Sequence, residues 1–97
     1  MNGNKIELWH VPSPGSELAE KLEEMGLDAN DLAARMGYTP KAVNDILQGN
    51  SRITPDVAIM LEVITEIPAD YWLRRQMSHD EFLSRERVKA SLSDQPL

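Results

Sequence analysis

Cysteine is absent from this chain of 97 residues. Its absence excludes disulfide bonds and thiolate metal sites, and a reducing cytoplasm is the compartment we expect. Long apolar runs are also missing, since nothing approaches the roughly 18 consecutive apolar residues of a membrane-spanning helix. The first residues lack the basic and then apolar pattern of a signal peptide. We therefore expect one compact domain that has no membrane partner.

Signals for catalysis or metal binding are equally scarce. The two histidines, His10 and His79, lie far apart, and no spacing of serine, histidine and aspartate implies a catalytic triad. Residues 79–81 read His-Asp-Glu, but neighbours on a helix point about 100° apart and cannot converge on one ion. Tyr71 and Trp72 are more typical of a core or a dimer interface than of a ligand-stacking site. The sequence predicts no enzyme, no metal, no cofactor and no small-molecule ligand.

The charge balance is acidic but uneven. A net charge of −6 argues against a generally sticky nucleic-acid binder. Residues 54–72 hold four acidic side chains and no basic one, whereas residues 29–53 hold three basic and two acidic ones. The central segment is therefore repelled less by a phosphate backbone than residues 54–72 are.

Start and stop signals predict five helices within residues 13–90. Serine, threonine or aspartate caps, followed in most cases by proline, mark the starts, and glycines mark the ends. The starts are Ser13-Pro14, Asp28 (with Asp31 as a capping-box partner), Thr39-Pro40, Thr54-Pro55 and Pro68, and the ends are Gly26, Gly37 and Gly49. Residues 1–12 are predicted to be an extended arm or a short strand, and residues 91–97 a flexible tail. The predicted fold class is all-α, with a long last helix.

The two central helices are predicted to form a helix-turn-helix. Only Gly37-Tyr38-Thr39 separate them, which suits a near-perpendicular turn better than an antiparallel hairpin. Ala33 is small where the helices meet, and Gly37 supplies the positive φ of the turn. Val43 and Ile46 form the inward face of the second helix. This spacing favours DNA binding over an ordinary solvated helix.

In that interpretation residues 40–48 form the recognition helix, with its N-terminal half in the major groove. Asn44 and Gln48 suit adenine edges, and Lys41 suits guanine or phosphate. Asp45 would repel phosphate but could accept a hydrogen bond from cytosine. The predicted DNA-binding residues are Thr39, Lys41, Ala42, Asn44, Asp45, Gln48, Ser51 and Arg52.

A homodimer is expected, because one recognition helix reads only a few base pairs and a two-fold dimer reads a palindrome. The last helix is the predicted interface. Its candidate residues are Trp72, Leu73, Gln76 and Phe82, with Leu83 beside them. A place in the core is the preferred interpretation for Trp72.

Several motifs occur in a fixed order from Pro14 to about Asp80. They are Pro14-Gly15, the six residues 32–37 (Leu-Ala-Ala-Arg-Met-Gly), residues 46–49 (Ile-Leu-Gln-Gly), residues 53–55 (Ile-Thr-Pro), Ala58 with Leu61-Glu62, and residues 72–76 (Trp-Leu-Arg-Arg-Gln). In this combination the chain resembles the HigA/VapI-type antitoxins of the XRE, or phage-repressor-like, helix-turn-helix family.

The resemblance implies a dimeric protein that binds a palindromic operator. It also implies a HigB-like ribonuclease toxin as partner, which the antitoxin neutralises while repressing their shared operon. Three residues depart from the family pattern. Ala29 replaces a glutamine that often bonds a phosphate, Arg75 replaces an apolar residue, and Gln48 replaces an asparagine.

Two other functions stay open from the sequence. One is a stand-alone XRE-family regulator with no toxin, because nothing in the sequence is specific to a toxin. The other is an interaction module that kept the helix-turn-helix scaffold and lost DNA binding, which the net acidity and Ala29 favour.

Overall fold

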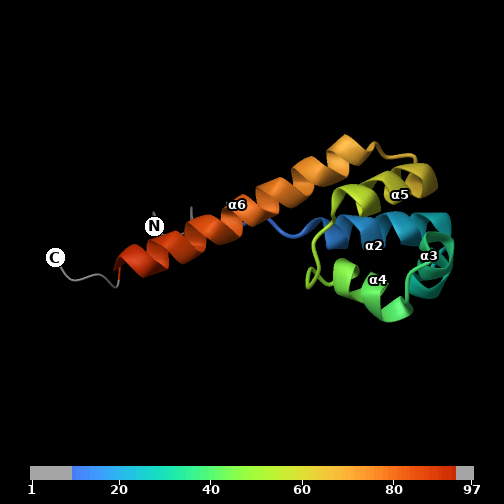
Figure 1. Ribbon diagram of the computed structural model, residues 1–97, viewed down its shortest axis with the longest axis horizontal. Helices are drawn as coiled ribbons and strands as arrows, with labels where there is room; N and C mark the ends of the chain where they lie inside the picture. Colours follow the sequence, from blue (N-terminus) through green and yellow to red (C-terminus); the bar gives the residue numbers. More distant parts are fainter. Residues whose placement is uncertain (1–9, 94–97) are drawn as a thin grey trace.

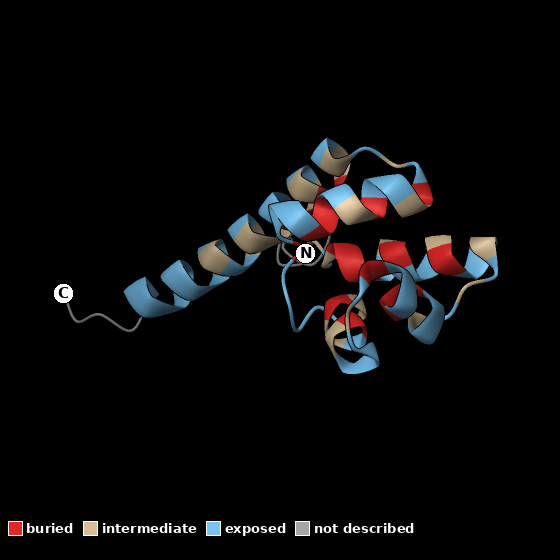
Figure 2. Cartoon of the chain, turned by 45° about the vertical axis from the view of Figure 1, so that its right-hand side comes forward, coloured by how far each residue is buried: buried red, intermediate tan, exposed pale blue. Residues whose placement is uncertain are grey.

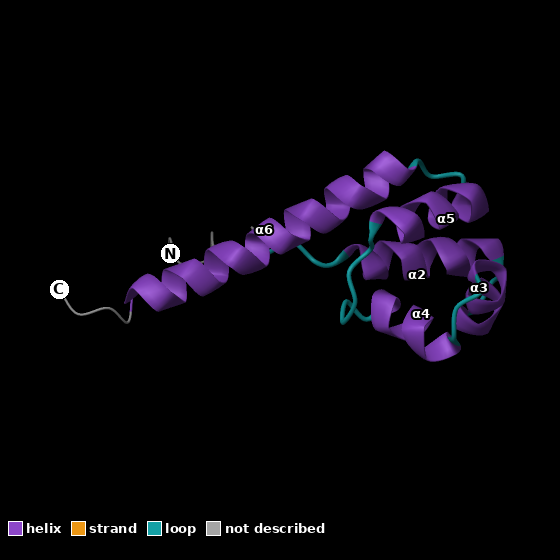
Figure 3. Cartoon of the chain, in the orientation of Figure 1, coloured by secondary structure: helices purple, strands orange, loops and turns teal. Residues whose placement is uncertain are grey.

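The computed structural model describes residues 10–93. Its five helices are α2 (Pro14–Met25), α3 (Ala29–Met36), α4 (Pro40–Leu47), α5 (Pro55–Thr65) and α6 (Ala69–Ser93) (Figures 1 and 3). All regular secondary structure within the described range is helical, which confirms the all-α prediction. The predicted arm or strand over 1–12 falls mostly on residues 1–9, outside the described part; residues 10–12 are irregular. None of the five helices is long and apolar enough to cross a membrane.

The helices begin where the capping residues predict. Thr39 and Thr54 each accept a hydrogen bond from the backbone three residues on, and proline follows each as the first helical residue. Asp28 and Asp31 form a reciprocal capping box, with N–H to carboxylate distances of 2.8 and 2.9 Å. These short-range bonds satisfy backbone donors that would otherwise lack partners. Local sequence therefore sets the helix boundaries.

Two glycines serve different geometric needs. Gly37 ends α3 with φ of 71°, a left-handed conformation that costs other residues energy. Gly15, in the first turn of α2, lies against the C-terminal end of α4, where a Cβ would overlap the carbonyl oxygens of Ile46 and Leu47. Gly15 thus permits the close approach that orients α4 relative to α2.

The core lies where α2, α3, α4, α5 and the first half of α6 meet (Figure 2). Trp72 of α6 is fully buried in it, together with Val43 of α4 and Leu61 of α5. The other buried apolar residues are Leu18, Leu22, Leu32, Ala33, Met36, Ile46, Ile53, Val57 and Ala58. The core therefore anchors one face of the recognition helix and the first turns of α6.

Helix α6 extends beyond this core. At 25 residues it is about 37 Å long, and its distal half runs out from the domain (Figures 1 and 2). The helix continues through Ser93, three residues beyond the predicted boundary at residue 90. Residues 94–97 lie outside the described range. The earlier end near residue 90 is predicted because residues 91–97 are mostly polar and include a proline.

Candidate nucleic-acid interface

Helix α4 has one buried and one exposed face, as a recognition helix requires. Val43 is fully buried and Ile46 is 5% exposed, whereas Lys41 and Asn44 are exposed. Ala42 and Asp45, which also belong to the predicted DNA-binding residues, are half-buried and not fully exposed. The apolar face fixes the rotation of the helix about its axis, because turning it would expose Val43 to water. Asn44 and Lys41 are thereby held on the side available to a ligand.

The first turn of α4 is held by Thr39. Its Oγ1 accepts a hydrogen bond from the Ala42 backbone N–H at 3.1 Å. Pro40 has no N–H to leave unsatisfied at the first helical position. The first turn is therefore capped at the end predicted to enter the groove.

Lys41 and Asp45 form an ion pair one helical turn apart, with Nζ 3.1 Å from Oδ2. The Lys41 side chain is 85% exposed, so the pair adds at most about 0.5 kcal/mol to the stability of the helix. The pair places a positive charge beside the Asp45 carboxylate.

The segment after α4 folds back onto the helix end. The backbone N–H groups of Asn50 and Ser51 both donate to the Asp45 carbonyl, at 2.8 and 3.1 Å. Gln48 accepts a 3.4 Å hydrogen bond from the Asn50 side chain and stays exposed. Gln48, Ser51 and Arg52 therefore lie together on the exposed turn at the C-terminal end of α4.

Arg52 forms hydrogen bonds with Asp80 of α6. Its Nε and Nη2 donate to Oδ2 of Asp80, at 3.0 and 2.6 Å. The other oxygen, Oδ1, accepts from Gln76 Nε2 at 3.0 Å, and Gln76 Oε1 accepts from the Ile53 backbone N–H at 2.8 Å. This chain of contacts, from Arg52 through Asp80 and Gln76 to Ile53, ties residues 52–53 to α6. We call it the α6 clamp.

The contacts of the α6 clamp also shift the pKa values of Asp80 and Arg52. Partial burial favours the neutral form of Asp80, but the hydrogen bonds from Arg52 and Gln76 outweigh it and hold the pKa of Asp80 below its usual value. The hydrogen bond to Asp80 likewise raises the pKa of Arg52. The pair is therefore ionised throughout the physiological pH range.

The sequence did not reveal the clamp. The sequence predicts a dimer interface for Gln76 and no partner for Asp80, because their partners lie 23 and 28 positions away. The available signal was their i,i+4 spacing, which places both side chains on the same face of a helix.

The predicted dimer residues divide into two groups. Trp72 is fully buried and Gln76 is 4% exposed within one protomer, so neither has surface to offer a second copy. Their assignment to the interface is corrected on that ground, and Trp72 lies in the core. Leu73 and Phe82 are half-buried.

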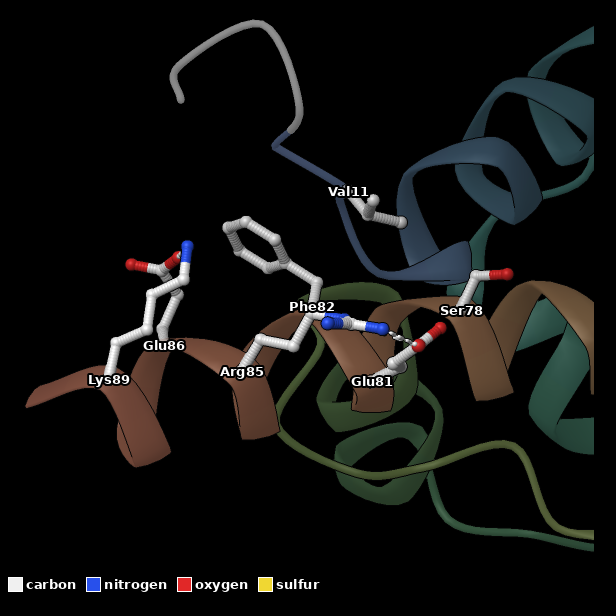
Figure 4. A pocket seen from close by; sticks show the side chains of 7 residues that line it. All are labelled: Val11, Ser78, Glu81, Phe82, Arg85, Glu86 and Lys89. Carbon is white, nitrogen blue, oxygen red and sulfur yellow. Dashed lines mark hydrogen bonds and ion pairs between the residues drawn. The ribbon is translucent and has the colours of Figure 1, made fainter. Parts of the chain in front are cut away.

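Phe82 already has a partner within the chain. Its ring meets that of His10 edge to face, with centroids 4.8 Å apart. One helical turn earlier, Nδ1 of His79 lies 2.7 Å from the Val11 carbonyl oxygen. A groove of about 400 Å³ separates Val11 from the distal part of α6, with Phe82 in its wall and the Glu81–Arg85 ion pair beside it (Figure 4). Residues 10–11 therefore run along α6.

Arg75, the departure from the family pattern in α6, has a specific partner. Its Nε and the hydroxyl group of Tyr71 both donate to the carboxylate of Glu17 on α2. The hydrogen bond to Glu17 raises the pKa of Tyr71. An ion pair here joins α2 to α6 beside the core.

Residues 10–93 contain no group of three histidine, aspartate or glutamate side chains placed to hold a metal ion.

With this geometry established, the family follows from comparison. A helix-turn-helix family model, HTH_3, matches residues 18–72, which span α2 to the first turn of α6. The chain belongs to this helix-turn-helix family. It is a family of DNA-binding regulators of the XRE type and not of enzymes.

Two curated relatives support the assignment to the helix-turn-helix family. The uncharacterised HTH-type transcriptional regulator YddM of Escherichia coli K12 is 31% identical over 73% of this chain and 76% of its own length. Virulence-associated protein I of Dichelobacter nodosus is 35% identical over 69% of this chain; the match spans 63% of that protein, somewhat less than two thirds.

Solved structures extend the likeness to about nine tenths of the chain. A HigA-family addiction module antidote protein from Coxiella burnetii superposes with a TM-score of 0.78 at 26% identity, covering 91% of this chain and 97% of that one. The Pseudomonas aeruginosa antitoxin HigA, solved with the higBA promoter, has the same fold at a TM-score of 0.78 and 23% identity, covering 90% and 96%. The resemblance to HigA and VapI stated from the motifs is therefore confirmed.

Proposed function

We propose that this protein is the antitoxin of a HigBA-like toxin–antitoxin module, and that it binds a palindromic operator as a homodimer and represses its own operon. The observation that carries the DNA-binding part is the orientation of α4. Burial of Val43 and Ile46 leaves Lys41 and Asn44 exposed on a short helix. The N-terminal end of this helix is capped by Thr39 and is exposed to solvent.

Asn44 is the proposed base-reading residue, because its amide can donate and accept at once to an adenine edge. Thr39, Lys41, Ser51 and Arg52 flank it and are proposed to contact the backbone. Ala42, Asp45 and Gln48 complete the proposed surface, with Asp45 paired to Lys41.

The homodimer is proposed to form through the distal half of α6. That part of the helix exposes Val88 and Leu92, which are 55 and 66% accessible. Exposed apolar side chains on a helix that projects from its own core favour burial against a second protein. Leu73 and Phe82 lie nearer the domain body and would border this interface.

The toxin partner rests on likeness alone. The Coxiella burnetii protein is described as an addiction module antidote, and it shares 97% of its length with this fold. We therefore propose a HigB-like ribonuclease toxin as the second protein partner, in the cytoplasm.

An electrophoretic mobility shift tests the DNA-binding part. The full chain is titrated into a labelled duplex from immediately upstream of its own coding sequence, at two salt concentrations and with scrambled competitor. We expect a shift that survives the competitor and weakens steeply with salt. Absence of a shift at micromolar protein would refute operator binding and favour the interaction-module alternative.

A further inference from the structure

The hollow between the end of the recognition helix and α6 is the feature with the clearest unassigned chemistry. It measures about 330 Å³, and Gly49 and Arg52 form one wall. The other wall is α6, and it contributes Gln76, His79, Asp80, Leu83, Ser84 and Arg87. Two arginines from segments 35 positions apart therefore face the same space.

The α6 clamp uses only part of the hydrogen-bonding capacity of the Arg52 guanidinium. A guanidinium has five N–H donors, and only Nε and Nη2 are directed at Asp80, both at the same carboxylate oxygen. The remaining Nη1 edge is free to bind a second anion, and 63% of the side chain is exposed. Asp80 thus fixes the direction of the arginine without occupying all of it.

Arg87 supplies a second cation. Its Nη2 donates to Ser84 Oγ at 2.9 Å, a neutral partner that leaves its charge uncompensated by that contact. Ser84 lies about one turn beyond Asp80 on α6, and Arg87 lies about two turns beyond it. Counting Arg52, Arg87 and Asp80 together, the charged side chains of the hollow sum to one positive charge.

The position of the hollow matches where a DNA backbone would pass. Gly49 and Arg52 directly follow α4, and α6 runs on beyond the domain past that loop (Figure 1). In helix-turn-helix complexes, residues at the end of the recognition helix face the phosphates that flank the bases being read.

We infer that this hollow is a seat for one DNA backbone phosphate, in which Asp80 and Gln76 position Arg52 and Arg87 of α6 contributes the second contact. The inference rests on the proposed function and adds α6 to the DNA-binding surface. Asp80 and Gln76 are positioning residues, since they act on the phosphate through Arg52 and Ile53.

The sign of the Asp80 effect discriminates between two roles. If Asp80 only adds negative charge near the DNA, then Asp80→Ala raises the affinity. If it orients Arg52, then Asp80→Ala lowers the affinity, and it has no further effect once Arg52 is alanine.

The experiment is a fluorescence-anisotropy titration of the upstream duplex at several salt concentrations. We expect Arg52→Ala and Arg87→Ala each to weaken binding by roughly tenfold, for cognate and scrambled duplexes alike. Each should also reduce the slope of log K against log salt by about 1. Asp80→Ala should weaken binding by a similar factor, and Arg52→Ala/Asp80→Ala should match Arg52→Ala.

Arg74→Ala is the matched control. Arg74 lies on the same helix, is 72% exposed and pairs with Asp70, but it does not line the hollow. We expect wild-type affinity and salt slope from it. Circular dichroism spectra and the more conservative Asp80→Asn guard against a folding defect in Asp80→Ala; Asp80→Asn should weaken binding in the same direction.

The outcomes separate the two proposals. If the wild-type chain binds the duplex but Arg87→Ala behaves like Arg74→Ala, or Asp80→Ala binds more tightly, the phosphate seat is wrong and operator binding stands. If the wild-type chain binds neither duplex, the proposed function fails, and the seat fails with it.

Discussion

Arg52 and Asp80 join the end of the recognition helix to α6 through two hydrogen bonds to a single carboxylate oxygen, at 3.0 and 2.6 Å. Asp80 also accepts from the buried Gln76, which holds the Ile53 backbone N–H. The loop that follows α4 is therefore positioned by a helix that lies outside the helix-turn-helix itself. Because of this arrangement, substitutions in α6 that break these contacts should alter the position of Arg52 at the proposed DNA-binding surface.

The ion pair should make stability sensitive to acid. The pKa of Asp80 is lowered in the folded protein relative to its ordinary value of 3.8, so its ionised form favours folding. That contribution is complete well above the ordinary pKa and is lost as the pH falls through the folded value. We expect the difference in unfolding free energy between wild type and Asp80→Asn to be constant near neutral pH and to shrink below about pH 4.

Urea denaturation at a series of pH values measures this difference. A difference that persists unchanged down to pH 2 would show that the Asp80 carboxylate contributes nothing as a charged group.

Gly15 and Gly37 should respond differently to alanine. At Gly15 a Cβ would overlap the carbonyl oxygens of α4, so Gly15→Ala forces α2 and α4 apart. We expect a loss of about 2–3 kcal/mol in stability, at the upper end for overpacking. At Gly37 nothing lies within 4 Å of the Cβ position, and the cost is only that of φ at 71°, about 1 kcal/mol.

Chemical denaturation of the two variants, compared with wild type, gives both values. Equal losses at the two positions would contradict the close approach of α2 to α4.

Much of this fold could be predicted from sequence because its signals are local. The capping box of Asp28 and Asp31 and the threonine caps at Thr39 and Thr54 lie within three residues of their partners. The apolar spacing of Val43 and Ile46 likewise fixed the buried face of α4 in advance.

The α6 clamp and the interior position of Gln76 could not be predicted in this way. They depend on how α6 crosses the loop after α4, and that crossing is set by packing around Trp72. The same long-range packing removes Trp72 and Gln76 from the predicted dimer interface and shifts the proposal to Val88 and Leu92.

Dimerisation through the distal part of α6 is tested by charge substitution. We expect Val88→Asp and Leu92→Asp each to give monomers, because a carboxylate buried at a two-fold interface meets its own copy or loses its hydration. Multi-angle light scattering on a sizing column reports the mass directly.

Val63→Asp is the control for the same chemical change. Val63 is 77% exposed on α5, away from the proposed interface, so this variant should remain dimeric. Dissociation by Val63→Asp alone, with Val88→Asp unaffected, would move the interface to α5.

The most direct test of the central claim, that α4 reads DNA sequence, is the specificity ratio of Asn44→Ala. The dissociation constants of wild type and variant are measured for the upstream duplex and for its scrambled counterpart under identical salt. We expect a loss of about 1–3 kcal/mol in binding free energy on the cognate duplex and unchanged binding to the scrambled duplex. An equal loss on both duplexes, or no loss on either, would contradict the assignment of Asn44 as a base-reading residue.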